Sequence, residues 1–200
     1  MSGKILLSTA YLPPVEYFTL IQGADEILIE KEENYQKQTY RNRCRILSSN
    51  GLQVLTVPVM KGSLQKTKVK EIEIDSSKRW QQVHLRAMSA SYSSSPYFQY
   101  YFGNIERIIH GNHKFLLDLN LDLLESVLEM LRLKRSISLT SFFEPVKDSD
   151  YDFRYRITPK AETNSPAKEY FQVFNKSGFV PGLSIIDLIF NMGPESSSFL

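Results

Sequence analysis

The sequence predicts an α/β fold: an N-terminal β-α-β unit with a parallel or mixed sheet flanked by helices, followed by a helical segment. Two observations carry this prediction. Two short apolar runs, Lys4–Thr9 and Glu26–Glu30, enclose a segment whose apolar residues recur at near-helical spacing. Farther along, helix-like periodicity dominates residues 76–135. We expect the 200 residues to form one domain, with a loop-rich part at residues 144–168.

The first strand is predicted at Lys4–Thr9, and the two prolines that follow at once exclude its continuation. Pro14 suits the first position of a helix, which we expect to run to Gly23. Glu26–Glu30 is then the second strand. Strand, helix and strand in succession imply parallel pairing with a right-handed crossover. Ligands of such sheets bind beyond the carboxyl ends of the strands.

A hairpin is predicted next, because Asn50-Gly51 is a strong turn signal between Cys44–Ser48 and Leu52–Val59. Lys61–Lys70 is basic and polar and indicates a loop. Glu71–Asp75 alternates apolar and acidic residues and predicts a short strand or an edge segment with one wet face.

Helices are predicted at Trp80–Ser91 and from Tyr97 to Ile109, separated by a serine-rich stretch that ends at Pro96. The clearest amphipathic helix is Leu121–Leu131, preceded by Asp118-Leu119-Asn120. Ser136–Phe143 alternates weakly and indicates a strand.

The C-terminal part begins with the polar segment Glu144–Lys168, which predicts a long loop with room for one short strand at Tyr151–Arg156. Ser184–Asn191 predicts a helix with a buried apolar face, ended by Asn191 or Gly193. Ser184 and Asp187 have the spacing of a capping box, so capping is the alternative to a role in a site.

Three arginines, Arg41, Arg43 and Arg45, sit two residues apart in a stretch rich in aromatic and amide side chains. On a strand they share one face, because side chains alternate with period two. Guanidinium groups bind phosphate and carboxylate through a planar fork of donors, so this face predicts an anion site near the loop at Tyr11. The alternative is a structural network in which acidic neighbours pair with the arginines: Glu30, Glu32 and Glu33.

Composition narrows the class of protein. The chain is 42% hydrophobic and 23% charged, as in soluble globular proteins. A net charge of only +2 argues against a nucleic-acid-binding protein, although residues 31–80 hold eleven Lys/Arg against five Asp/Glu. The single cysteine excludes an internal disulfide and fits a reducing compartment. No apolar run has the roughly 20 residues of a membrane span, and the start lacks a signal-peptide core, so we expect a cytoplasmic protein.

Few residues have the chemistry of a catalyst. The chain has no glycine-rich phosphate loop, and its three histidines lack metal-ligand spacing, so no metal site is predicted. Cys44 lacks an evident base and is interpreted as a small strand residue. His84 lies on one helical face with Trp80 and Tyr92, where it can serve as a general base or as a core histidine.

The motifs together resemble the WbqC-like protein family. They follow the family's order along the whole chain, although Thr9-Ala10 stands where Gln-Pro is usual. The motifs are Tyr11-Leu12-Pro13-Pro14 with Tyr17-Phe18 and Leu20-Ile21; Tyr35-Gln36-Lys37 with Arg41-Asn42-Arg43; Trp80, His84 and Tyr92; Pro96-Tyr97-Phe98; and Ser184-Ile185-Ile186-Asp187 with Phe190-Asn191 and Gly193.

This resemblance implies a place in bacterial surface-polysaccharide (O-antigen) biosynthesis, with transfer of glycine to a sugar as the suggested reaction. Combining motifs and chemistry, we expect His84 and Asp187 to be catalytic. The residues expected to bind substrate are Tyr11, Tyr17, Tyr35, Gln36, Arg41, Asn42, Arg43, Tyr92, Ser184 and Asn191. No cofactor is assigned.

Three classes of function follow from these residues. The first is a group-transfer enzyme acting on an activated sugar or acyl donor, and the second is a non-catalytic module that binds a nucleotide sugar or glycan. Both predict an anionic small molecule or nucleotide sugar as the partner. The third, a nucleic-acid binder, uses the same mixture of basic and aromatic residues but conflicts with the low net charge.

Overall fold

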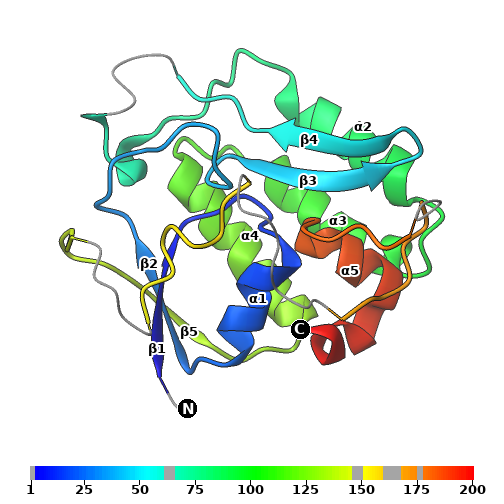
Figure 1. Cartoon of the computed structure of the whole chain (residues 1–200). Coiled ribbons are helices and arrows are strands. Elements are labelled where there is room, and N and C mark those ends of the chain that lie inside the picture. Colours follow the sequence, from blue (N-terminus) through cyan, green and yellow to red (C-terminus); the bar gives the residue numbers. More distant parts are fainter. Residues whose placement is uncertain (1–2, 61–65, 146–150, 160–167, 175–177) are drawn as a thin grey trace.

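The structure, a computed structural model, is an α/β fold built around a small parallel sheet (Figure 1). It describes residues 3–60, 66–145, 151–159, 168–174 and 178–200. Strands β1 (Lys4–Ser8), β2 (Glu26–Glu30) and β5 (Ser136–Leu139) form the sheet, in the order β1-β2-β5. Both pairings are parallel, and Lys4 lies opposite Glu26. The predicted β-α-β unit is therefore confirmed.

Helix α1 (Val15–Gln22) makes the crossover between β1 and β2. Pro14 is its N-cap in extended conformation rather than its first helical residue, and Gly23 ends it as expected. Phe18 and Ile21 are fully buried, as is Ile27 of β2. Burying such side chains typically stabilises the fold by about 1.5–3 kcal/mol each, and this fixes the crossover against the sheet.

Strand β5 follows helix α4 (Leu116–Met130), which begins at Leu116 rather than at the predicted Leu121. Asn120 lies inside the helix, and its amide donates to Thr9 Oγ1 (3.1 Å) and to the carbonyl oxygen of Arg41 (2.9 Å). That tertiary contact was invisible in the local pattern. It ties α4 to the end of β1.

The predicted hairpin is confirmed as β3 (Arg43–Ser48) and β4 (Gly51–Thr56), with Gly51 at φ 99° after the turn. No continuous strand forms at Glu71–Asp75, but the segment has the one wet face of the alternative prediction, because Ile72 and Ile74 are buried and Glu71 and Glu73 are exposed. A 3-10 turn, η2 (Val69–Glu71), is followed only by isolated bridges, because successive residues there bond to different segments of the chain. Part of the loop predicted at Lys61–Lys70 lies outside the described residues.

The remaining helices agree with the sequence patterns. They are α2 (Trp80–Tyr92), α3 (Phe98–Ile109) and α5 (Ile185–Met192), and the 3-10 segment η3 (Gly193–Phe199) follows α5. The apolar face predicted for α5 is buried, and Gly193 ends the helix at a positive φ of 54°.

The segment at residues 151–159 runs beside β1 and crosses its carboxyl end (Figure 1, yellow). The short strand allowed for at Tyr151–Arg156 is reduced to a single parallel bridge between Leu6 and Asp152. The backbone of Leu6 bonds to Tyr151 and Phe153. The outer edge of β1 is thus covered. The rest of the predicted Glu144–Lys168 loop lies partly outside the described residues.

Candidate functional site

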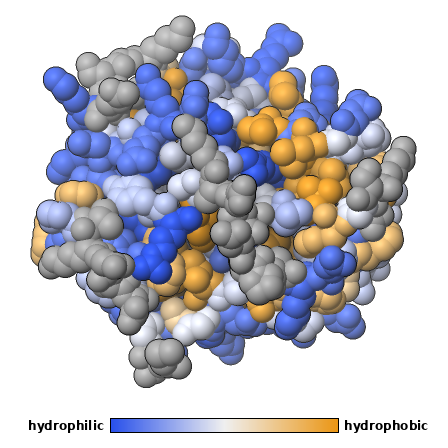
Figure 2. All heavy atoms as spheres, viewed as in Figure 1, coloured by the Kyte–Doolittle hydropathy of each residue, from blue (hydrophilic) through white to orange (hydrophobic). Residues whose placement is uncertain are grey.

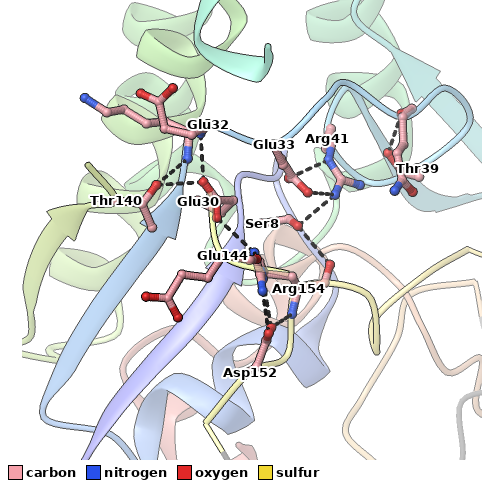
Figure 3. Close-up of polar contacts among 12 residues, drawn as sticks. Ser8, Glu30, Glu32, Glu33, Thr39, Arg41, Thr140, Glu144, Asp152 and Arg154 are labelled. Atoms are coloured by element: carbon pink, nitrogen blue, oxygen red, sulfur yellow. Dashed lines mark hydrogen bonds and ion pairs between the residues drawn. The ribbon is translucent and has the colours of Figure 1, made fainter. Parts of the chain in front are cut away.

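A buried charged network occupies the carboxyl ends of the three parallel strands (Figure 3). Ser8 ends β1, Glu30 ends β2, and Thr140 directly follows β5. Thr140 donates its hydroxyl to Glu30 Oε1 at 2.7 Å. The parallel topology brings the three side chains to one edge, where Arg41 and Arg154 meet them.

Arg41 is held in this network by Glu33 and Ser8. Its Nε and Nη2 donate to the two carboxylate oxygens of Glu33 at 2.9 and 2.7 Å, and Nη2 also donates to Ser8 Oγ at 2.8 Å. Arg41 is 4% exposed and Glu33 1%. Of the two alternatives that the sequence left open for Arg41, the structure contains the acidic partner, and this partner is Glu33.

Arg154 forms the second half of the network. It makes a two-pronged pair with Asp152, at 3.0 and 2.6 Å, and its Nη1 donates to Glu30 Oε2 at 3.0 Å. Its hydrogen bonds to Asp152 raise the pKa of its guanidinium. Ser8 Oγ donates to the Arg154 carbonyl oxygen at 2.8 Å, so Ser8 links the two arginines.

An open pocket of about 560 Å³ adjoins this network, on the ligand-binding side of an open α/β sheet. We name it the strand-end pocket. The residues that line it combine aromatic, amide and charged side chains: Glu32, Asn34, Tyr35, Gln36, Lys37, Lys68, Phe143 and Tyr155. Two of the predicted binding residues, Tyr35 and Gln36, therefore share one cavity.

Tyr155 connects the pocket to the network below. The Arg41 guanidinium lies 5.6 Å from the centre of the Tyr155 ring, and the Tyr155 hydroxyl bonds to Glu33. Burial raises the pKa of Tyr155 and also raises that of Tyr35, to about 12. Both phenols are therefore protonated at neutral pH and present a neutral aromatic surface to the pocket.

The charge of the pocket wall is set by Glu32 and two lysines. Lys68 and Lys70 donate to the two carboxylate oxygens of Glu32 at 2.6 and 2.7 Å. These bonds lower the pKa of Glu32 to about 2. With Lys37 in the same wall, the cations outnumber this carboxylate. The side-chain charges of the wall therefore sum to a positive value.

His84 lies elsewhere, under the β3–β4 hairpin. Its Nδ1 accepts from the Tyr11 hydroxyl at 2.9 Å and its Nε2 donates to the Thr56 carbonyl oxygen at 3.2 Å, which fixes the neutral tautomer. Burial lowers the pKa of His84 to about 4. The predicted neighbour Trp80 is in contact with its ring, and so is Tyr11, which the sequence did not predict there.

Asp187 lies in a third place, in the first turn of α5, where its side chain is buried in the core. It accepts hydrogen bonds from Tyr170 (2.8 Å), Gln172 (3.2 Å) and Tyr92, and burial raises its pKa to about 6. The capping box proposed for Ser184 and Asp187 is wrong, because the Ser184 hydroxyl donates to the Leu12 carbonyl oxygen instead.

The other predicted residues are spread around these three places. The Tyr17 hydroxyl donates to the Ser8 carbonyl oxygen at 2.9 Å. The Asn42 and Asn191 amides donate to backbone carbonyls, those of Val57 and Asp187. Arg43 is half-buried, and its Nε has no hydrogen-bond partner within the described part of the chain. The structure therefore groups Tyr17 and Arg41 with Ser8, and Tyr92 and Asn191 with Asp187.

Sequence reasoning missed Arg154, Asp152 and Tyr155. They lie in a segment interpreted as a loop, and no residue near them in sequence indicates that their partners are Glu30 and Glu33. The alternation of aromatic and charged residues over Tyr151–Arg156 was the available signal, because such a pattern in a polar loop indicates one buried and one solvated face.

Two searches of the described residues were negative. No group of three or more His, Cys, Asp or Glu side chains among them is arranged to hold a metal ion. None of the described helices has both the length and the apolar character needed to cross a membrane.

Comparison with known proteins identifies the family. The chain matches the uncharacterised protein Rv1507c of Mycobacterium tuberculosis (strain ATCC 25618 / H37Rv) with 28% identity over 228 aligned positions, covering 100% of this chain and 98% of the relative. No solved structure matches it. The sequence profile of the WbqC-like protein family matches residues 9–165 and 157–199. The chain therefore belongs to the WbqC-like protein family.

Proposed function

We propose that the protein binds a nucleotide sugar, or a related anionic sugar, in the strand-end pocket. The observation that carries the proposal is the position of this open cavity of about 560 Å³ beside the carboxyl ends of β1 and β2. Sites for small ligands in open α/β sheets lie at this edge. The volume falls within the range of pockets for small-molecule ligands.

The chemistry of the lining suits such a ligand part by part. Tyr35 and Tyr155 offer aromatic surfaces for the flat face of a sugar or a base. Asn34 and Gln36 supply amide donors and acceptors for hydroxyl groups. Lys37 and Lys68 supply positive charge for a phosphate or carboxylate.

Arg41 and Arg43 differ in what they can contribute. Arg41 is engaged with Glu33 and Ser8, so we propose that it holds the floor of the pocket and influences the ligand through Tyr155. Arg43 is half-buried, its Nε has no hydrogen-bond partner among the described residues, and its charge acts on Tyr35 in the pocket lining. Arg43 is therefore the arginine that we propose as an anion contact.

Group transfer to a sugar, such as transfer of glycine in bacterial O-antigen biosynthesis, is the second candidate. The observation that favours it is the pair Lys37 and Lys68 in the pocket wall, which would stabilise the charge on a departing phosphate. Neither His84 nor Asp187 lines this pocket, and both are committed to buried hydrogen bonds. We therefore propose that these two residues stabilise the fold through these hydrogen bonds and do not transfer protons.

Titration calorimetry with a panel of nucleotide sugars and sugar phosphates tests the proposal. We expect saturable binding of at least one anionic sugar and weaker binding of its uncharged parent sugar. Mass spectrometry of incubations with that ligand, an activated glycyl donor such as glycyl adenylate, and candidate sugar acceptors separates the two candidates, because the acyl group moves to the sugar as the phosphate leaves. A new sugar-linked product supports group transfer, and saturable binding without a product supports the binding module. No binding by any member of the panel would end both readings.

A further inference from the structure

Strand β4 has an unpaired outer edge. Val57 N donates to the Asn42 carbonyl oxygen at 2.8 Å, and this bond fixes which pairs of the antiparallel ladder exchange hydrogen bonds. By that alternation, the N–H and C=O groups of Leu52, Val54 and Thr56 point away from β3. The Thr56 carbonyl accepts from His84. Within the described residues, the backbone groups of Leu52 and Val54 have no protein partner.

This edge lacks the devices that usually protect an unpaired strand. Proteins block such edges with lysine, proline or a bulge, because an open edge pairs with other chains. Gly51–Thr56 contains neither proline nor a charged residue. Leu52 is 51% exposed and Val54 48%. Hydrophobic side chains (orange) gather over this hairpin in Figure 2.

A groove of about 360 Å³ runs between this edge and the start of α2, the helix beside β4 in Figure 1. One wall consists of residues from β4 and the turn after it, and the other consists of α2 and the two cations before it. The lining residues are Gln53, Val54, Leu55, Thr56, Pro58, Lys78, Arg79, Trp80, Val83 and His84. Val83 is 58% exposed, so the helical wall is apolar as well.

The end of the groove is positive. Lys78 and Arg79 are exposed, and Arg79 is the N-cap of α2. The helix has no acidic residue in its first turn and no side-chain cap, so its positive dipole end adds to the two cations. A carboxylate is the group that this end of the groove fits.

We propose that the β4–α2 groove binds an extended peptide, which adds to the β4 edge as a further strand. Its apolar side chains at alternate positions would pack on Val54, Trp80 and Val83, and an acidic side chain would meet Lys78 and Arg79. The six residues of β4 span about 20 Å, which suits a partner segment of about five or six residues. A second copy of this chain fits less well, because its own Gly51–Thr56 edge offers no carboxylate.

The proposal is tested by selecting, from a phage-displayed library of random octapeptides, those that bind the immobilised protein. We expect enrichment of sequences that alternate β-branched and polar residues and carry Asp or Glu near one end. A synthetic peptide from the selection should bind wild type by fluorescence polarisation. Val54→Pro, which removes one outward N–H and no ladder bond, should weaken binding by about tenfold, and Val54→Thr, which keeps the N–H, is its matched control.

Two further measurements keep the test independent of how Val54→Pro folds. Methylating the alternate backbone nitrogens of the peptide that face β4 should abolish binding to wild type. The double variant Lys78→Glu, Arg79→Glu should reverse the preference for acidic peptides. Absence of enrichment, or binding that tolerates the methylated peptide, overturns the proposal. A wild-type dimer in sedimentation that dissociates in the Val54→Pro variant also overturns it, because a second copy would then occupy the edge.

Discussion

Arg41 and Glu33 form a buried, two-pronged ion pair at the carboxyl ends of the parallel strands, with donor–acceptor distances of 2.9 and 2.7 Å. The pair also reaches β1 through Ser8 and reaches the strand-end pocket through Tyr155. A charge buried to this degree depends on its partner, because desolvation opposes it wherever the partner is absent. Arg41 therefore belongs to the framework that shapes the pocket.

Replacing Arg41 with alanine should destabilise the protein strongly. The substitution leaves the Glu33 carboxylate buried without its cation, which typically costs about 3–5 kcal/mol. Urea unfolding followed by circular dichroism measures this loss. The double variant Arg41→Met, Glu33→Leu removes both charges and should lose less than the single variant does. An Arg41→Ala variant as stable as wild type would contradict a framework role.

Ser8→Ala tests the link between the two arginines. Ser8 Oγ accepts from Arg41 and donates to the Arg154 carbonyl oxygen, so its removal leaves one buried donor and one buried acceptor unpaired. We expect a loss of about 1–3 kcal/mol in the free energy of unfolding. Ser198→Ala is the control, because the exposed Ser198 hydroxyl donates to a nearby residue of the chain, the Glu195 carbonyl oxygen. Equal stabilities for the two variants would be inconsistent with the network.

His84 should make the folded state less stable as the pH falls from about 6.5 to about 4. Its pKa is about 4 in the folded protein, against 6.5 for an ordinary histidine, so the unfolded chain binds more protons across this window. Stability therefore rises with pH there, by about 3 kcal/mol in total. The difference in unfolding free energy between wild type and His84→Gln, measured from pH 4 to 7, isolates this contribution. A difference independent of pH would show that His84 is not buried in its neutral form.

Asp187 should have the opposite dependence. Burial raises its pKa from 3.8 to about 6, so the folded state binds the proton more tightly. The stability that the protonated form confers is complete below pH 3.8 and is lost as the pH rises through about 6. Because this trend opposes that of His84, the wild-type curve alone does not separate them. The free energy of unfolding of wild type minus that of Asp187→Asn should fall from pH 4 to pH 7. A rise over this range would contradict a raised pKa of Asp187 in the folded protein.

The local patterns were sufficient to predict the β-α-β unit, the hairpin and α5. Each of these elements depends on neighbours in sequence: the proline break before α1, the Asn50-Gly51 turn, and the apolar face at Ile185, Ile186 and Ile189. Short-range signals of this kind survive folding, since the tertiary structure does not compete with them.

The charged network was beyond local prediction for a physical reason. Arg154 pairs with Glu30 across 124 positions of sequence, and the covering of β1 by residues 151–153 determines that partner. Likewise, Ser184 had a suitable spacing for capping, but the nearby Leu12 carbonyl took its hydroxyl. Where several partners can satisfy one polar group, packing decides among them and spacing does not.

The most direct test of the central claim, that the strand-end pocket binds an anionic sugar, compares charge variants by calorimetry with the best ligand of the panel. Lys68→Gln should weaken binding, and Lys4→Gln, at the opposite end of β1, should leave it unchanged. We expect a loss of about tenfold for Lys68→Gln, the size of one charge-assisted hydrogen bond, with a lower sensitivity of binding to salt. Equal affinities for wild type and both variants, at low and at physiological salt, would contradict the account.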